Sequence, residues 1–285
     1  MMSNYYCVVA GLPELAFDGS KAPFTVEKFR EEVYPFLEKE DARCIDLFFM
    51  AWDNANILLL LRDGADSILE RKGCYSKEQL LEIMAAAKEG DPRRSDIPEY
   101  MYDFLEYYYA NEERTDILWE DNLALRYYAY AMKCGNKFIS EWFDFNLNVN
   151  NILVAVLARK YKLNIETCVL GDGEVAEAIR TSGARDFGLT GVLDYLEMVI
   201  RISENDKLQE RERMLDDMRW NWLDDNSVFD YFTVERLFVF LQKLDIIERW
   251  AVLDAEKGMQ RYKELIDELK SGTVSFIKDK EKNNL

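Results

Sequence analysis

The chain has 285 residues, of which 49% are hydrophobic and 13% aromatic, so it is long enough to bury roughly three quarters of its unfolded surface. It has 36 lysines and arginines and 54 aspartates and glutamates, which gives a formal charge of −18. Because binding to nucleic acid or anionic lipid depends on clustered cations, this balance argues against both partners and is typical of an acidic cytosolic surface.

The predicted elements are almost all helical. The segment 4–13 combines aromatic and β-branched residues before Gly-Leu-Pro, which predicts a short extended stretch. Thr25 offers an N-cap for a helix over 25–39, and 45–62 is long, apolar and poor in breakers, as expected of a buried helix. Further helices are predicted, in chain order, over 75–88, 99–109, 115–134, 138–161, 189–224 and 234–270.

Two connectors divide this helical pattern. The first, 90–98, reads G-D-P-R-R-S-D-I-P, and the second, 171–188, is a mixed section rich in glycine. Few prolines and glycines occur elsewhere, so we expect one compact body rather than domains on flexible linkers. The predicted fold is all-α, with three modules of similar size over 1–92, 93–185 and 186–285.

One helix carries polar residues where a core is expected. The stretch 52–64, W-D-N-A-N-I-L-L-L-L-R-D-G, places Asp53, Asn54 and Asn56 before an apolar run that ends at Arg62. Burying such groups costs several kcal/mol unless they pair or form internal hydrogen bonds. These residues therefore either face water or bond to one another and to neighbouring helices.

A second copy of the pattern occurs about a hundred residues later. Asn150 and Asn151 precede an apolar run that ends at Arg159, and Asn151 is eight residues from Arg159, as Asn54 is from Arg62. Eight residues are about two helical turns, so each pair is expected near one face of its helix.

A third, looser copy starts at Glu235, in 232–250, but it lacks the Asn and the Arg in register. Two interpretations stay open. Each segment is a core helix with polar ends satisfied by capping and water, or its polar residues lock neighbouring helices through buried hydrogen bonds. Because the pattern is repeated, the second interpretation carries as much weight as the first. The polar residues of all three copies are therefore candidates for helix locking.

The sequence offers little catalytic chemistry. It has no histidine, which removes Ser-His-Asp and Cys-His sites and the common zinc and di-iron arrangements, and it has no phosphate-binding glycine motif. Acidic pairs such as Asp103 and Glu106 are expected on a solvated face, and the aromatic cluster over 100–109 is expected to pack in a core or an interface. We predict no catalytic, cofactor-binding or metal-binding residues and no cofactor; an enzyme that uses carboxylates alone is the least favoured reading.

The cysteines are scattered, odd in number and never in a C-x-x-C pair, so we expect reduced core thiols of a cytosolic protein. The five cysteines are Cys7, Cys44, Cys74, Cys134 and Cys168.

The sequence shows no signal peptide pattern. The most apolar stretch, 45–61, is interrupted by Asp46 and Asp53, so no transmembrane span is predicted. If the protein works at a membrane, we expect it to work from outside the bilayer.

The stretch D-N-A-N-I-L-L-L-L-R-D-G resembles a helix of the C-type subunit of archaeal and bacterial V/A-type ATPases, the counterpart of the d-type subunit of the vacuolar enzyme. In that family an acid and an Asn precede an apolar run ending in Leu-Arg, and the pattern recurs in three pseudo-symmetric helical modules. The close of the chain, 240–258, resembles the last module of that family. Most of the chain is also similar to a bacterial family of unknown function encoded among V-type ATPase genes, through Tyr5, Tyr6, Leu12 and Pro13.

This resemblance implies a funnel-like, non-catalytic adaptor of a bacterial V-type ATPase. Such an adaptor sits on the cytoplasmic face of the membrane rotor ring, receives the central shaft made by the subunits named D and F, and passes torque for ion transport. Its location would be cytoplasmic and peripheral to the cell membrane through the complex, without insertion into the bilayer. The alternative is a cytosolic helical interaction or assembly factor unrelated to rotary ATPases.

Overall fold

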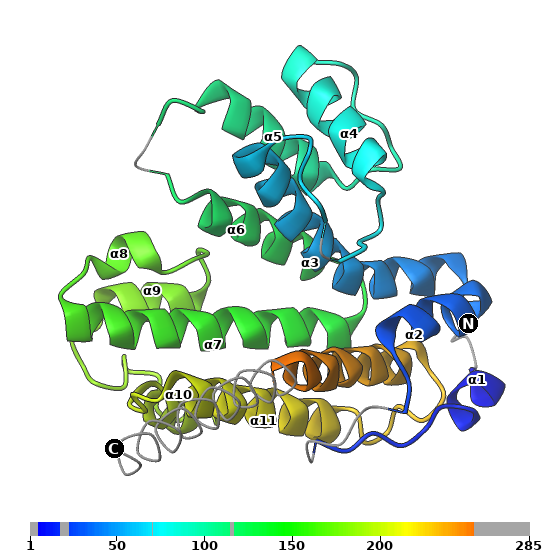
Figure 1. Ribbon diagram of the computed structural model, residues 1–285. Coiled ribbons are helices and arrows are strands. Elements are labelled where there is room, and N and C mark those ends of the chain that lie inside the picture. The colour runs from blue at the N-terminus through cyan, green and yellow to red at the C-terminus, as the bar shows by residue number, and fades with distance from the viewer. Residues whose placement is uncertain (1–4, 18–22, 70, 115–116, 254–285) are drawn as a thin grey trace, which may run out of the picture. The chain divides into compact units, whose positions relative to one another are not determined.

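The computed structural model describes residues 5–17, 23–69, 71–114 and 117–253 (Figure 1). Within those residues every regular element is a helix and there is no strand, which confirms the all-α fold class. A further helix covers 234–253, orange in Figure 1. The other elements are α1 (Tyr6–Ala10), α2 (Val26–Glu32), the 3-10 helix η1 (Tyr34–Phe36), α3 (Lys39–Asp63), α4 (Lys77–Glu89), α5 (Glu99–Ala110), α6 (Trp119–Ala131), α7 (Lys137–Tyr161), α8 (Ile165–Cys168), α9 (Glu174–Thr181), α10 (Leu196–Ser203) and α11 (Leu208–Asn226).

The described residues form two compact units, one within 5–9 and 36–239 and one within 10–17, 23–35 and 240–253. In the smaller unit, Phe24 meets the ring of Phe240 edge-on at 5.7 Å. The backbone N–H of Val26 donates to a carboxylate oxygen of Glu248 at 2.8 Å. The early and late parts of the sequence thus form one unit, whereas the three predicted modules, which follow the chain in order, stay a prediction.

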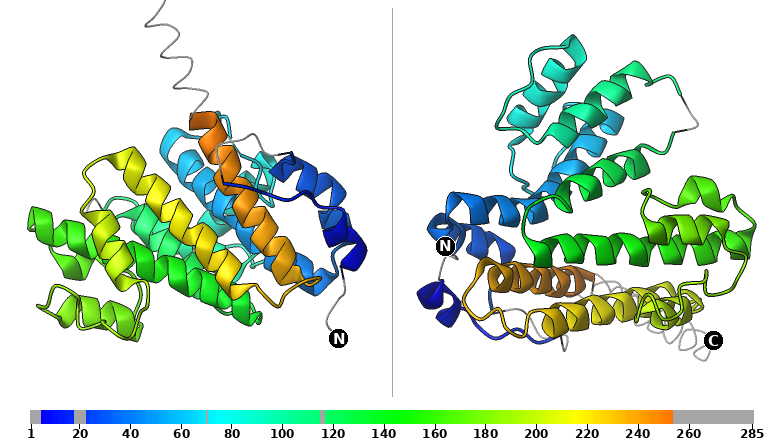
Figure 2. Two further views of the ribbon diagram at one scale, coloured as in Figure 1. Left: turned by 90° about the horizontal axis from the view of Figure 1, so that it is seen from below. Right: turned by 180° about the vertical axis from the view of Figure 1, so that it is seen from behind.

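In the larger unit, α3 is a 25-residue core helix. It has neither Gly nor Pro in its interior and is followed by Gly64, whose φ of +88° suits glycine. Both α3 and α5 pack against α6, so the three helices lie together in Figures 1 and 2. On the aromatic face of α5, the ring of Phe104 meets Trp119 of α6 at 6.4 Å, which confirms the expected packing role of the cluster over 100–109.

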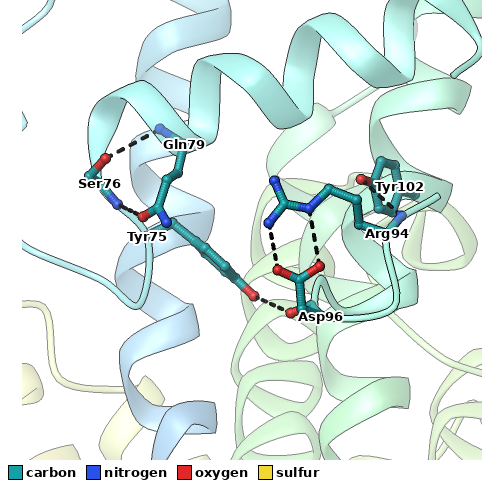
Figure 3. Close-up of polar contacts among 6 residues, drawn as sticks. All are labelled: Tyr75, Ser76, Gln79, Arg94, Asp96 and Tyr102. Carbon is teal, nitrogen blue, oxygen red and sulfur yellow. Dashed lines mark hydrogen bonds and ion pairs between the residues drawn. The ribbon is translucent and has the colours of Figure 1, made fainter. Parts of the chain in front are cut away.

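The connector between α4 and α5 is held by polar contacts (Figure 3). Helix α4 begins with a capping box in which Ser76 and Gln79 each bond to the other's backbone N–H. Just before this helix, the Tyr75 hydroxyl donates to the carbonyl of Asp96 at 3.3 Å, and Arg94 forms a bidentate pair with the Asp96 carboxylate. The expected connector over 90–98 is therefore confirmed, and it is an ordered one.

The other long helix of this unit, α7, also has 25 residues. Asn136 caps its start by accepting from the N–H of Ile139 at 3.1 Å. Helices α8, α9 and α10 pack against α7, with α8 and α9 drawn above it and α10 below it in Figure 1. The ring of Phe145 stacks on Trp222 of α11 at 5.1 Å, so α7 is buried on more than one side.

Three predicted elements are wrong. The segment 4–13 is not extended, since Tyr6–Ala10 is helical. The predicted helix over 25–39 ends at Glu32 and is followed by η1. The predicted helix over 189–224 is two helices, α10 and α11, separated by a turn. The part of the last predicted helix beyond 253 lies outside the described residues.

By length and composition, α3 is the single candidate for a membrane span among the described helices. Of its most apolar stretch of 18 residues, 61% is buried inside the protein. A core helix with this burial passes the same test as a membrane span.

Candidate functional site

Asp53 lies in the middle of α3 and is completely buried. Its carboxylate accepts hydrogen bonds from the backbone N–H groups of Cys74 at 2.7 Å and Tyr75 at 3.2 Å. The backbone at Gly73 lies so close to this carboxylate that a Cβ added there would be 1.9 Å from Asp53 Oδ1. The carboxylate is therefore an anchor for the segment that leads into α4, as the locking interpretation predicts.

The two asparagines beside Asp53 bind different segments. Asn54, also buried, accepts from the hydroxyl of Tyr100 in α5 at 2.8 Å, and burial raises the pKa of that hydroxyl well above its ordinary value. Asn56 donates to the carbonyl of Arg71 at 3.0 Å. Together with Asp53, they tie α3 to α5 and to the segment before α4.

Arg62 does not lock helices, which corrects the prediction for this residue. Its side chain is 72% exposed and forms a bidentate pair with its neighbour Asp63, with both oxygens at 2.9 Å. This pair raises the pKa of Arg62 and lowers that of Asp63. An exposed pair between adjacent residues spans no gap between helices, so it contributes little to the fold.

In α7, Asn151 makes the counterpart of the Asp53 anchor. It is 2% exposed, donates to the carbonyl of Leu170 at 2.8 Å and accepts from the N–H of the same residue at 2.8 Å. Asn150 is half-buried and donates to the hydroxyl of Tyr128 in α6 at 3.2 Å. Thus α7 is bonded forward to the segment after α8 and back to α6.

Arg159, unlike Arg62, bonds to a segment distant in the sequence. Its guanidinium donates to the carbonyls of Ser182 at 2.6 Å and Ala184 at 2.5 Å, and it lies 3.9 Å from the centre of the Phe187 ring. Burial lowers the pKa of this guanidinium. It therefore holds the turn that follows α9 against the end of α7.

Glu235, the candidate in the looser third copy, is 9% exposed at the start of the helix over 234–253. One of its carboxylate oxygens accepts from the side-chain amide of Asn136 at 2.6 Å. Since Asn136 is the N-cap of α7, this contact joins the start of that helix to the start of the later one. Glu235 thus acts as an anchor without the register of the first two copies.

The two long helices share one construction. In α3, Asp53 binds the backbone 21 and 22 residues further along the chain, and in α7, Asn151 binds the backbone 19 residues further along. In each case a buried side chain of the helix fixes the segment that follows that helix and folds back against it. Buried polar groups that are fully paired rigidify a fold and specify one arrangement, and a rigid scaffold is what this arrangement supplies.

A family model described as "Protein of unknown function (DUF2764)" matches residues 2–273 of the chain. The chain belongs to the DUF2764 family. A search of curated proteins and a search of solved structures found no match.

The described part of this DUF2764 chain contains no group of three or more His, Cys, Asp or Glu side chains placed to hold a metal ion. An open cavity of about 360 Å³ is lined by Met198 of α10 together with two arginines and two glutamates. Arg185 and Glu204 in its wall pair at 2.8 Å, so part of the charge is already neutralised. The surface acids Asp103 and Glu106 both pair with Arg93, as expected of a solvated face.

The sequence reasoning missed one buried pair in the DUF2764 fold. Arg219 of α11 donates to Asn146 of α7 at 3.0 Å and pairs at 3.3 Å with Asp216, which is completely buried. The i,i+3 spacing of Asp216 and Arg219 was a usable signal. Neither residue follows the Asn-to-Arg pattern of the two long helices.

Arginines 62 and 159 of the DUF2764 chain make a matched test of that pattern. Arg159→Ala is expected to lower the free energy of unfolding by about 1–2 kcal/mol, because two backbone carbonyls lose a charged donor. Arg62→Ala is expected to leave the urea midpoint unchanged, because its partner is exposed. Urea denaturation followed by circular dichroism measures both, and equal effects would contradict the assignment.

Proposed function

We propose that this chain is a non-catalytic adaptor of a bacterial V-type ATPase, similar in role to the C-type subunit. It would link the central shaft, made by the subunits named D and F, to the membrane rotor ring and transmit torque for ion transport. The observation that supports this most is the use of the Asp53-to-Asn56 segment, the part that carries the resemblance. There the polar residues of a core helix bond to backbone groups of a later segment and to the hydroxyl of Tyr100.

Rigidity is the property that a torque-transmitting part requires. A loose joint would absorb a rotation as local deformation, whereas packed cores with paired polar groups resist it. In this chain the segments after α3 and after α7 are both fixed by buried side chains, Asp53 and Asn151. The anchors therefore suit an adaptor whose work is mechanical.

The charge of the chain agrees with a role among proteins. At −18 it would repel nucleic acid and the anionic surface of a cytoplasmic membrane. An adaptor of this kind would reach the membrane through contacts with the ring rather than with lipid.

The test is co-purification. The V-type ATPase is extracted in mild detergent from membranes of the native organism through an affinity tag on a catalytic subunit, and its components are quantified by mass spectrometry. We expect this chain at an amount comparable with the shaft proteins D and F, and we expect the reciprocal result with a tag on this chain. A complete complex that contains D and F but lacks this chain would refute the proposal.

One observation favours the alternative of an interaction or assembly factor outside any ATPase. The turn between α11 and the helix over 234–253 exposes Val228, Phe229 and Tyr231, and the Phe229 side chain is 88% exposed. Exposed aromatic residues in succession are typical of surfaces that bind other proteins. Capture of partners other than ATPase components by the tagged chain, with no D or F among them, would support this alternative.

A further inference from the structure

The turn that follows α11 presents large apolar side chains to solvent in an ordered arrangement. Val228 and Tyr231 are each more than half exposed, and Phe229 is 88% exposed. The turn is held from within, because the hydroxyl of the buried Ser227 donates to a carbonyl of α11 at 2.7 Å. The backbone N–H of Asp230 in turn donates to the carbonyl of Ser227 at 3.1 Å. The exposed side chains therefore project from a fixed turn.

Helix α1 lies beside this turn and extends its apolar surface (Figures 1 and 2). The backbone N–H of Tyr5 donates to the carbonyl of Phe232 at 2.7 Å, and the exposed ring of Tyr6 lies 4.7 Å from the Phe232 ring. The ring of Tyr231 lies 6.4 Å from the same ring. Cys7, next in the chain, is also exposed, whereas a core thiol was expected there. The two segments thus form one aromatic surface, made of Tyr6, Val228, Phe229, Tyr231 and Phe232.

A surface of this kind is typical of protein interfaces. Contiguous exposed apolar side chains rimmed by polar residues mark interaction sites, and aromatic residues are enriched among those that contribute most to binding. Because the turn is already ordered, a partner would pay little to fix these side chains in place. The whole surface lies in the larger unit, since residues 5–9 and 36–239 form it.

The charge around the aromatic surface is negative. The stretch 224–236 carries four acids and one base, which are Asp224, Asp225, Asp230, Glu235 and Arg236. Burial and the charge of Glu235 raise the pKa of the Asp230 carboxyl, and Asp230 has no ion-pair partner among the described residues. One carboxylate oxygen of Glu235 is buried without a hydrogen-bond partner in the same part of the chain. A cation brought by a partner would therefore meet negative charge that the described chain leaves unpaired.

We propose that the aromatic surface binds a basic, amphipathic segment of a partner protein. Apolar side chains of that segment would pack on Phe229 and Tyr231, and its lysines or arginines would lie near Asp230. The net charge of −18 would attract such a segment from a distance, and it would repel both anionic lipid and a second copy of the chain. The inference goes beyond the proposed function and does not depend on it.

The first experiment uses a fluorescein-labelled, short amphipathic peptide of leucine and lysine as the probe. A peptide of the same pattern with glutamate in place of lysine is its control. Binding to the full-length chain is measured by fluorescence anisotropy. We expect the lysine peptide to bind at low ionic strength, to bind more weakly as salt is added, and the glutamate peptide not to bind. Failure of the lysine peptide to bind, or equal binding of both peptides, would overturn the proposal.

Substitutions locate the binding. Phe229→Ser is expected to weaken binding of the lysine peptide about tenfold, and Asp230→Asn about threefold. The matched controls are Ile68→Ser, at a residue that is also 88% exposed, and Asp172→Asn, at another exposed acid. Neither control should change the affinity. Circular dichroism checks that all four variants keep their fold. Equal weakening by the controls would show that the peptide binds to the acidic surface in general, and would overturn the proposal.

Two measurements test the other occupants of this surface. Sedimentation velocity shows whether the chain self-associates, and flotation with phosphatidylcholine vesicles shows whether it binds lipid. We expect neither a dimer nor a vesicle-bound fraction that is lost in Phe229→Ser. Either one would show that the aromatic surface is used for self-association or for a membrane, and would overturn the proposal.

The last experiment identifies the partner in native cells. Phe229 is replaced by the photo-reactive benzoylphenylalanine, and cross-linked peptides are sequenced by mass spectrometry. We expect a peptide with apolar residues and net positive charge, and we expect Asp230→Lys to abolish the cross-link. A basic peptide supports the inference whether it comes from a rotary ATPase subunit or from another protein, so co-purification alone decides the proposed function. An acidic peptide, a peptide of this same chain or the absence of any cross-link would overturn the inference.

Discussion

Replacing Asp53 with alanine is expected to lower the free energy of unfolding by about 3–5 kcal/mol, because buried backbone donors lose a charged acceptor. The N–H groups of Cys74 and Tyr75 would lose their bonds to the carboxylate, and the space left in α3 is closed to solvent. Urea denaturation followed by circular dichroism measures the loss. Asp63→Ala, at the exposed end of the same helix, is the matched control and should leave the midpoint unchanged.

Gly73 provides a second test of the Asp53 anchor. A Cβ at this position would lie 1.9 Å from Asp53 Oδ1, so Gly73→Ala alone is expected to cost about 2–3 kcal/mol through overpacking. In the Asp53→Ala background the obstructing oxygen is gone, and the same change should cost much less. Simple additivity of the two substitutions would show that Gly73 and Asp53 do not meet as the structure has them.

The long core helices were predictable because their pattern is local. The interior of α3 and that of α7 contain no Gly or Pro, and α3 closes at Gly64, so propensity and burial agree. The anchoring role of Asp53 and Asn151 followed from the cost of burying them unpaired. Their partners could not be predicted, because an acceptor or donor on the backbone leaves no mark in the sequence.

Arg62 shows where the repeat pattern fails. Eight residues advance about 800° around a helix, which is about 80° beyond two full turns, so equal spacing fixes a direction only loosely. Arg159 becomes an anchor because the segment of Ser182 and Ala184 passes over it. The Arg62 side chain instead bonds to its neighbour Asp63 at the exposed end of α3. The difference is tertiary and lies outside each local pattern.

The wrong prediction for the N-terminal segment 4–13 has a similar cause. Its β-branched and aromatic residues favour a strand, yet Tyr5 is fixed by contacts distant in sequence. Its hydroxyl donates to Asp41 at 2.5 Å, and its backbone N–H donates to the carbonyl of Phe232 at 2.7 Å. Tyr6 then packs on the ring of Phe232 at 4.7 Å. Tertiary contacts therefore override the local preference here.

The break between α10 and α11 has only a weak signal in the sequence. Asn205 follows the end of α10, and its side-chain oxygen accepts from the N–H of Lys207 at 2.9 Å. Asn and Asp compete with helix formation by bonding to nearby backbone in this way. Without a Pro near this break, however, the run from 196 to 224 reads as one helix, and the hydrophobic period does not distinguish the two cases.

Replacing Asn151 with alanine is expected to lower the free energy of unfolding by about 2–4 kcal/mol, since the N–H and the carbonyl of Leu170 both lose their partner. Asn150→Ala, which removes one longer bond to Tyr128 at a half-buried position, is the control and should cost about 0.5–1 kcal/mol. Urea denaturation measures both, and a loss for Asn151→Ala no larger than that of the control would contradict the anchor.

The variant Asn151→Asp tests the donor half of this anchor through pH. A carboxylate at this site can accept from the N–H of Leu170, but it faces the Leu170 carbonyl without a proton to donate. Burial and that carbonyl would raise the pKa of the introduced acid in the folded state above its unfolded value of about 3.9. The unfolded state then releases its proton first, so the penalty is full at pH 7 and fades as the pH falls through the folded-state pKa. Stability measured relative to the unsubstituted chain should therefore recover between pH 7 and pH 4 for Asn151→Asp and stay constant for Asn151→Ala. A constant deficit in both variants would show that the Asn151 amide donates nothing to Leu170.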